Sequence, residues 1–378
     1  RKSVLKLQQW YRRRLLKLGT RYCAQFGQNM EQYSSSIDFV ISKLRPHYDE
    51  VISRITEVVR RVRPNAVCEI FGSYGNGMFT PHSDIDIVVA LQGSGPNASP
   101  FFEEAPFRMA VPKCVRNVGT SSCGVFDKNA KHHPDTKFNF GHTERNGFGM
   151  CAVRTATAPV DPIHEIVCEL TNANFVRSIK LIQSSRVPII KLGASSSGNV
   201  QASVDISVAS EFHGGLRAST FVSQVVMKNP VLRPMMLFLK QFLLEEGVLN
   251  VKDKSGGMTS YALFVLCVNY LRQGGWLDSW TAQEVWQWGG IMRDFFDLYG
   301  NNLDFSTVGV SVNGVYGLGP AGLLHTGPCV IDDPVSPGRT SGRPGNLGQN
   351  MFRINDVQRA FQKGWHLMVR ERLDVKRM

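Results

Sequence analysis

Two aspartates stand one residue apart in a run of β-branched residues, within the segment FGSYGNGMFTPHSDIDIVVA (71–90). In an extended strand, residues two apart project to the same side, so Asp84 and Asp86 are expected to place two carboxylates on one face. Burying two carboxylates about 6–7 Å apart is unfavourable unless a cation neutralises them. Magnesium prefers oxygen ligands, so the pair predicts a divalent-metal site on a strand.

A glycine–serine turn precedes the two aspartates. The segment AVCEIF (66–71) is predicted to be a strand, and Gly72 and Ser73 follow it directly. Glycine lets backbone amides approach a phosphate closely, and a serine hydroxyl donates to it. The combination suggests a nucleoside triphosphate held by this turn and, through metal ions, by Asp84 and Asp86.

The stretch GSYGNGMFTPHSDID resembles the signature of the polymerase-β-type nucleotidyltransferases, in which a later strand supplies a third carboxylate. Here SVDISVA (203–209) supplies Asp205, and RVPIIKL (186–192) resembles its partner strand in the template-independent RNA tailing enzymes. The resemblance continues through PMMLFLKQFLL (234–244), GGMTSYAL (256–263), FFDLYG (295–300) and VIDDPVSPG (330–338). It implies an α+β fold, with a polymerase-β-like palm of mixed sheet and helices and a mostly helical C-terminal domain.

The predicted organisation has four parts. Residues 1–44 form N-terminal helices that pack on the C-terminal domain, 45–210 form the palm, 95–161 form a module inserted in the palm, and 211–378 form the base-recognition domain. Apolar spacing predicts helices at 30–44, 47–62, 232–246, 260–272 and 282–299, and Thr259 is expected to cap the fourth. The glycine- and proline-rich segment 309–350 is expected to be mainly loops.

Aromatic residues in the inserted module favour a small folded unit over a disordered loop. Its cysteines and histidines leave zinc binding open, although their spacing matches no known finger. These residues are Cys114, Cys123, His132, His133, His142 and Cys151.

Bulk composition is consistent with an RNA substrate. The 378 residues carry 43 Lys or Arg against 31 Asp or Glu, a net charge of +12 that suits a polyanion. The eight cysteines are scattered without a CxxC pair, which indicates a reducing compartment. No apolar run reaches the roughly 20 residues of a membrane span, so no membrane partner is expected.

The first thirty residues contain eight Lys or Arg and no acidic residue. Such a start resembles the region around a mitochondrial transit peptide, and the alternative is a basic surface helix that faces RNA. Because the sequence begins with Arg1, we expect an N-terminal piece to precede it. The predicted location is mitochondrial, with a nuclear location as the alternative.

The resemblance assigns roles by position. Asp84 and Asp86 would bridge two Mg²⁺ or Mn²⁺ ions, and Asp205 would hold the ion that activates the RNA 3′-hydroxyl for attack on the α-phosphate. Lys240 would neutralise the outgoing phosphates and Tyr261 would stack on the base. The full set of implied substrate contacts is Gly72, Ser73, Ser83, Ser219, Lys240, Ser260, Tyr261 and Asp333, with Lys191 contacting RNA.

The identity of the base is left open between two nucleotides. Asp333 can accept a hydrogen bond from N3 of uracil or from N6 of adenine. Pro337 and Gly338 resemble the nuclear-surveillance poly(A) polymerases, whereas Ser219, the insertion and the basic start resemble the mitochondrial RNA-editing uridylyltransferases, particularly the minor editosome-associated type. The prediction is a terminal uridylyltransferase that adds UMP from UTP to a single-stranded RNA 3′ end, and the alternative is a poly(A) polymerase that uses ATP.

Two other classes fit less well. A small-molecule nucleotidyltransferase shares the glycine–serine turn and the paired aspartates, but not the DDPxxPG loop or the basic charge. An inactive RNA-binding scaffold would be expected to have lost an aspartate, and all three are present. A protein complex is left open as a partner.

Overall fold

The computed structural model describes residues 21–91, 135–138, 162–183, 187–209, 214–249, 256–277, 284–319, 327–337 and 344–370. These residues form two compact units, between which the chain passes more than once. The six-stranded unit comprises the described residues of 41–79 and 83–219. The helical unit comprises those of 1–40, 80–82 and 220–378.

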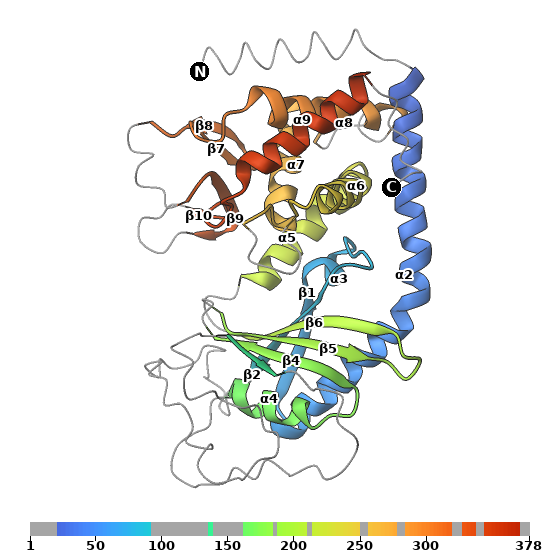
Figure 1. Ribbon diagram of the computed structural model, residues 1–378, viewed down its shortest axis with the longest axis vertical. Helices are drawn as coiled ribbons and strands as arrows, with labels where there is room; N and C mark the ends of the chain where they lie inside the picture. Colours follow the sequence, from blue (N-terminus) through green and yellow to red (C-terminus); the bar gives the residue numbers. More distant parts are fainter. Residues whose placement is uncertain are drawn as a thin grey trace. The chain divides into compact units, whose positions relative to one another are not determined.

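A mixed sheet forms the centre of the six-stranded unit, with strand order β1-β2-β6-β5-β4-β3 (Figure 1). Its strands are β1 (Ala66–Phe71), β2 (Ile85–Leu91), β3 (Asp135–Phe138), β4 (Val176–Ile182), β5 (Ile189–Ser195) and β6 (Gln201–Val208). β2 and β6 run parallel, and every other neighbouring pair is antiparallel. The predicted strands at 66–71 and 203–209 are confirmed, whereas β5 begins and ends three residues later than the segment 186–192 predicted.

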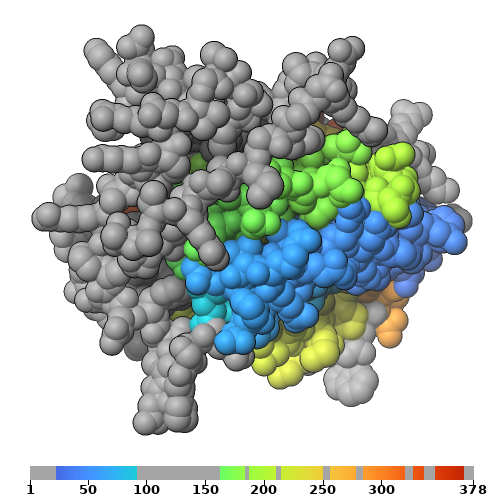
Figure 2. Space-filling view, turned by 90° about the horizontal axis from the view of Figure 1, so that it is seen from below, coloured from blue at the N-terminus to red at the C-terminus, as the bar shows by residue number. Residues whose placement is uncertain are grey.

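The two faces of this sheet differ because side chains alternate along each strand. In β6, Ala202, Val204 and Ile206 are buried, while Gln201 and Ser203 on the other face are exposed. Helices α2 (Arg21–Val62) and α4 (Pro162–Thr171) cover the apolar face: the side chain of Thr56 bonds Cys68 of β1, and Arg63 pairs with Glu165 at 2.6 Å. Figure 2 shows the blue surface of α2 continuous with the green surface of the segments from α4 to β6. We call the opposite face, which carries the register-paired Asp86, Asp205 and Lys191, the polar face.

Helix α2 is continuous, so the predicted break between 44 and 47 is wrong. Pro46 lies inside the helix and removes one backbone donor, a change that usually costs about 3 kcal/mol. Ile41 before it and Tyr48 and Val51 after it are all buried, so both flanking turns are held by packing. Tertiary contacts therefore outweigh the lost hydrogen bond.

The helical unit contains the three predicted C-terminal helices with small shifts at their ends: α6 (Leu232–Glu245), α7 (Ser260–Gly274) and α8 (Val285–Asp297), which continues into the π-helical turn η2 (Leu298–Asn302). Two further helices were not predicted individually: α5 (Gly215–Lys228), which begins in the six-stranded unit, and α9 (Ile354–Arg370). The predicted cap is confirmed, because Thr259 Oγ1 accepts from the Ala262 amide at 3.2 Å. Phe295, Tyr299 and Phe361 lie together in the core, with ring centroids 4.9–6.4 Å apart.

The expectation of mainly loops over 309–350 is wrong, because a second sheet forms there with the order β10-β9-β7-β8. Its strands are β7 (Val308–Ser311), β8 (Gly314–Gly317), β9 (Val330–Pro337) and β10 (Pro344–Asn346). The Asn346 side chain joins two segments, accepting from the Ile331 amide at 3.0 Å and donating to the Cys329 carbonyl at 2.9 Å. These strands are short and rich in glycine and proline, so their stability comes from such contacts rather than from local propensity.

The predicted inserted module, and with it the zinc alternative, lies outside the described residues except for β3 at 135–138. This strand extends the six-stranded sheet by pairing with β4. A search of the described helices finds none with the length and hydropathy needed to cross a bilayer.

Candidate active site

Backbone pairing brings the three predicted aspartates to the polar face of the six-stranded sheet. Asp86 of β2 lies directly opposite Asp205 of β6 in the parallel register. Paired residues in neighbouring strands project to the same face, so these two carboxylates are neighbours although 118 residues separate them in sequence. Asp84 immediately precedes β2 rather than lying within it.

Lys191 contacts this carboxylate cluster from β5, where it is the register partner of Asp205. Its Nζ lies 2.8 Å from Asp205 Oδ2, 3.1 Å from Asp205 Oδ1 and 3.9 Å from Asp84 Oδ2. Lys191, which the resemblance assigned to RNA, therefore neutralises two of the predicted metal ligands, Asp205 and Asp84, in this structure.

Burial and charge act in opposite directions on this pair. Burial raises the pKa of Asp205, the Lys191 ammonium lowers it, and Asp84 adds to the net rise. Burial lowers the pKa of Lys191, but the surrounding carboxylates of Asp205, Asp84 and Asp86 outweigh it and give a net rise. The cluster therefore favours a positive charge beside it.

The glycine–serine turn is shaped by the same cluster. Gly72 adopts φ +65°, and a Cβ at that position would overlap Asp86 Oδ2. Only glycine combines that backbone conformation with the space that the carboxylate needs. Gly72 begins the short helix α3 (Gly72–Asn76), Ser73 is its second residue, and Ser83 lies in the segment just before Asp84.

Ser219 lies next to this turn as well. A Cβ on Gly75 would lie 3.6 Å from Ser219 Oγ, so the hydroxyl on α5 faces α3. The structure thus brings together Asp84, Asp86, Asp205, Lys191 and Gly72 on one sheet face, and places Ser219 beside the turn that follows β1.

The donor chemistry of this cluster fits a hard divalent cation, because its carboxylate oxygens are the ligands that magnesium and manganese prefer. The ammonium of Lys191 lies between Asp205 and Asp84 and supplies a positive charge there. Among the described residues, no group of three carboxylate, imidazole or thiolate side chains is arranged around a single ion. Asp84, Asp86 and Asp205 are the residues that would hold the metal.

A second group of predicted residues lies in the helical unit. Tyr261 is the second residue of α7, and its hydroxyl donates to Asp333 Oδ1 of β9 at 3.2 Å. The same oxygen accepts from the Val335 amide at 3.0 Å, which orients the carboxylate. Burial, and next the Asp333 charge, raise the pKa of Tyr261, so the hydroxyl remains a donor. Ser260, also predicted, is the first residue of α7.

Lys240 lies on α6 with only 6% of its surface exposed. The helix around it is apolar, with Met236, Leu239 and Phe242 all buried. An ammonium in such surroundings is unusual, because burying a charge is unfavourable unless it is paired.

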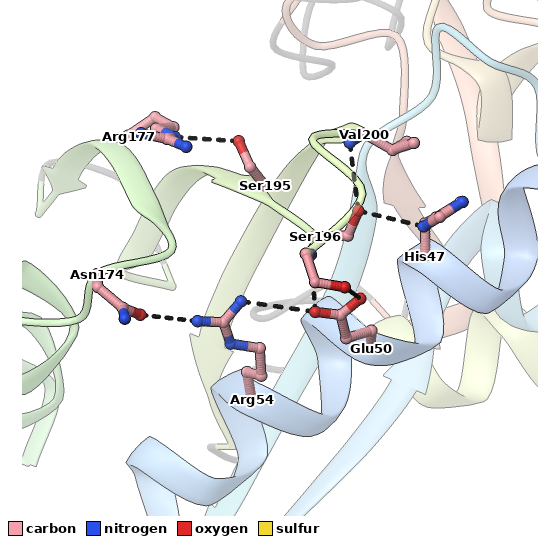
Figure 3. A network of polar contacts seen from close by, with 9 residues as sticks. His47, Glu50, Arg54, Asn174, Arg177, Ser195, Ser196 and Val200 are labelled. Carbon is pink, nitrogen blue, oxygen red and sulfur yellow. Dashed lines mark hydrogen bonds and ion pairs between the residues drawn. The ribbon is translucent and has the colours of Figure 1, made fainter.

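The end of the hairpin that carries Asp205 is fixed to α2 by polar contacts (Figure 3). Glu50 accepts from the Ser197 amide at 2.8 Å and from its hydroxyl at 2.9 Å, and Ser196 Oγ lies 3.2 Å from His47 Nδ1. One turn along the helix, Arg54 donates to Asn174 at 2.7 Å. The Glu50 and His47 contacts hold the β5–β6 turn, next to the register that pairs Lys191 with Asp205, while the Arg54 contact holds the segment between α4 and β4.

Sequence reasoning missed this turn contact and also Lys180 of β4, the register partner of Lys191. The alternation in VRSIKLI places Lys180 on the polar phase of its strand, which was the available signal. The pairing of β4 with β5, however, cannot be predicted from either segment alone.

Comparisons with known proteins agree with this architecture. Residues 43–224 match the family model described as the central palm domain of the poly(A) RNA polymerase, mitochondrial-like family. Poly(A) RNA polymerase protein 2 of Saccharomyces cerevisiae is 23% identical over 85% of this chain and 44% of its own length. The chain spans less than half the length of this and two other curated relatives.

Two solved structures resemble nearly the whole chain. The polymerase core of TRAMP, an RNA surveillance complex, aligns with a TM-score of 0.55 and 21% identity over 87% of this chain and 83% of that one. A cytoplasmic RNA terminal U-transferase aligns with a TM-score of 0.59 and 14% identity over 93% and 94% of the two chains. The chain therefore has the fold of the polymerase-β-type nucleotidyltransferases, as the sequence predicted.

Proposed function

We propose that this chain is a template-independent RNA terminal nucleotidyltransferase. The observation that carries the proposal is the register of Asp86 with Asp205, beside Asp84 and the Gly72 turn. Curated relatives named as poly(A) RNA polymerases and a similar structure named as an RNA terminal U-transferase support the same reaction class.

In the proposed reaction, the RNA 3′-hydroxyl loses its proton to water and its oxygen bonds to the α-phosphorus of a nucleoside triphosphate. The bond between the α-phosphorus and the oxygen that bridges it to the β-phosphate breaks, and pyrophosphate leaves. Asp84, Asp86 and Asp205 hold divalent ions, which when bound stabilise the attacking and leaving oxygens. Gly72 gives Asp86 the space for this orientation. Ser73, Ser83 and Lys240 are proposed phosphate contacts, and Ser219 is the proposed ribose contact.

We further propose that UTP is the preferred nucleotide and that Tyr261 and Asp333 recognise its base. Asp333 Oδ1 is oriented by two donors, Tyr261 and the Val335 amide, as expected for a carboxylate that accepts from a base edge. UTP is also supported by the resemblance of Ser219 and of the long segment between Asp86 and Asp205 to the uridylyltransferases. ATP is the second candidate, which the names of the curated relatives favour.

The test is to supply a single-stranded RNA primer with each nucleoside triphosphate separately, with Mg²⁺ or Mn²⁺. Extension with UTP at a kcat/KM well above that with ATP is expected. Long tails from ATP alone would show that ATP, not UTP, is the preferred nucleotide, and the proposed reaction class would stand. No extension with any of the four would contradict the proposed activity.

Location and partners are separate proposals. The basic, acid-free residues 1–30 support a mitochondrial location, which imaging of a C-terminal fluorescent fusion would test against the nuclear alternative. A protein partner is proposed because a similar structure is the core of an RNA surveillance complex. Affinity purification followed by mass spectrometry would identify it.

A further inference from the structure

Tyr74 connects the glycine–serine turn to helix α2. It is the third residue of α3, directly after Ser73, and only 5% of its surface is exposed. Its hydroxyl donates to Asp49 Oδ1 at 2.6 Å, and Cζ of Arg45 lies 4.9 Å from the centroid of its ring. Arg45 and Asp49 are four residues apart, so both project from the same side of α2. One turn of that helix therefore holds Tyr74 at the ring and at the hydroxyl.

Two other aromatic rings fix the position of the Tyr74 ring. Phe79 meets it edge to face with the centroids 4.9 Å apart, and Tyr48 of α2 does so at 6.2 Å. Phe79 and Tyr48 also contact each other, at 5.5 Å, and both are buried. Edge-to-face contacts at these distances are favourable for aromatic rings. A phenylalanine would pack equally well here, so the hydroxyl of Tyr74 adds a directional contact to the packing.

Helix α3 is closed by its own backbone hydrogen bonds, so its residues keep a fixed relation to one another. The Ser73 carbonyl accepts from the Gly77 amide, and also from the Met78 amide at 3.1 Å. At the first residue, a Cβ on Gly72 would overlap Asp86 Oδ2. The helix thus touches a predicted metal ligand at its first residue and is bonded to α2 at its third. The orientation of Ser73, which lies between these two points, depends on both.

The same stretch of α2 also holds the β5–β6 hairpin. Glu50 accepts from the Ser197 amide and hydroxyl, and His47 contacts Ser196 (Figure 3). Residues 45–50, less than two turns of one helix, therefore contact both the glycine–serine turn and the end of the hairpin that carries the third carboxylate.

We infer that Tyr74, through its bond to Asp49, is a positioning residue that orients Ser73 for the triphosphate. The inference rests on the proposed function, in which Ser73 contacts a phosphate. Successive residues of a helix lie about 100° apart around its axis, so holding Tyr74 against α2 directs Ser73 away from that helix. Ser73 is correspondingly less buried than Tyr74. A serine hydroxyl that is already oriented binds a phosphate without the entropic cost of ordering it.

The test compares Tyr74→Phe with Tyr48→Phe as the matched control. Both changes remove one hydroxyl from the same ring cluster, but Tyr48→Phe leaves the bond between Tyr74 and Asp49 in place. At the partner position, Asp49→Ala removes the acceptor and Asp49→Asn keeps one. The Kd values for UTP and for ATP are measured by calorimetry with Mg²⁺ and without RNA, and thermal unfolding of every variant is measured in parallel.

Tyr74→Phe is expected to raise the Kd of both nucleotides by about 3- to 10-fold, because a hydrogen bond to a charged group that orients the turn is lost. The factor should be the same for UTP and ATP, since the turn contacts phosphates and not the base. Tyr48→Phe should leave both Kd values unchanged even if its unfolding temperature falls.

The variants at position 49 should follow from the same bond. Asp49→Ala should raise the Kd as much as Tyr74→Phe does, and Asp49→Asn should bind more like the unchanged chain than like Asp49→Ala. The double variant Tyr74→Phe/Asp49→Ala should bind no more weakly than either single variant, because both remove one shared interaction. Additive effects of the two changes would show that they act separately and would overturn the inference.

An unchanged Kd in Tyr74→Phe would also overturn it, as would an equal rise in Tyr48→Phe, which would make the effect one of ring packing. A rise for only one of the two nucleotides would assign Tyr74 to base selection and contradict the positioning role. If any of these results is found while the unchanged chain binds nucleotide and extends a primer, only the role of Tyr74 is wrong. If the unchanged chain neither binds nucleotide nor extends a primer, the proposed function is wrong and the inference fails with it.

Discussion

The two groups of candidate residues are built in different ways. On the six-stranded sheet, Asp86, Asp205 and Lys191 are placed by backbone register, which fixes three side chains through consecutive strand pairings. In the helical unit, Tyr261 and Asp333 are joined by a single side-chain hydrogen bond between the start of α7 and β9. The difference teaches that the first group is positioned by backbone hydrogen bonds, which a side-chain substitution leaves in place, whereas the second depends on a side-chain contact that one substitution removes.

The largest effect is expected from removing one charge of the register-placed group. Asp86→Asn keeps the shape of the side chain but weakens its hold on a cation, so RNA extension should fall by about 10²- to 10³-fold or more. The measurement is single-turnover primer extension, with circular dichroism to verify folding. Glu69→Gln is the matched control, because Glu69 is an exposed carboxylate on the neighbouring strand β1 and should leave extension unchanged. Normal extension by Asp86→Asn would contradict the assigned site.

A smaller effect is expected when Asp86 is displaced by a substitution at its neighbour Gly72. Gly72→Ala places a Cβ against Asp86 Oδ2, and misplacing a catalytic side chain by about 1 Å costs roughly 10²-fold in rate. Gly77→Ala is the matched control, since Gly77 also has positive φ, +78°, but its Cβ would meet nothing within 4 Å. Both changes should cost about 1–2 kcal/mol of stability through backbone strain.

Only Gly72→Ala should lose activity at a temperature where both variants are folded. An equal loss of kcat in the two variants would mean that glycine is required at position 72 because of backbone strain, and not because of the contact with Asp86.

For the second group, the expected effects are on binding. Tyr261→Ala removes a stacking surface worth about 1–3 kcal/mol, so the nucleotide Kd should rise by roughly 5- to 150-fold. Tyr261→Phe keeps the ring and loses only the bond to Asp333, so its Kd should change less while the preference between UTP and ATP shifts. Nucleotide titration and the separate kcat and KM values check this. A Phe variant as weak as the Ala variant would show that the hydroxyl, not the ring, carries the binding.

The smallest effect concerns the contact that holds the hairpin. Hydrogen bonds from the Ser197 amide and hydroxyl lower the pKa of Glu50. A carboxylate with a lowered pKa in the folded state stabilises the protein above its unfolded pKa, about 4.3, and loses that contribution as pH falls through the folded value. Unfolding temperature should therefore fall less between pH 7 and pH 3.5 in Glu50→Gln than in the unchanged chain. If the unfolding temperatures of the two proteins depend on pH in the same way, Glu50 does not contribute to the loss of stability in acid.

Local patterns predicted much of both regions. The turn and strand around Gly72 and Asp86, the strand carrying Asp205, and helices α6 and α7 with the Thr259 cap all follow from short segments whose periodicity and capping act within a few residues. The assignment of Asp205 came from family resemblance, and the register with Asp86 agrees with it.

Two elements depended on distant contacts and were predicted wrongly. The continuity of α2 through Pro46 depends on buried residues in the turns on both sides, which propensity does not count. The four-stranded sheet between 308 and 346 pairs β7 in parallel with β9 and is joined by the Asn346 side chain, so its glycine- and proline-rich strands had no visible local signal.

The sequence by itself indicated a pair of carboxylates suited to a divalent metal, Asp84 and Asp86, because residue type and a spacing of two place both groups on one face of a strand. Only the tertiary structure decided that Lys191 neutralises Asp205 and that Lys180 of β4 is the register partner of Lys191. Register is a property of two strands, and no single segment contains it.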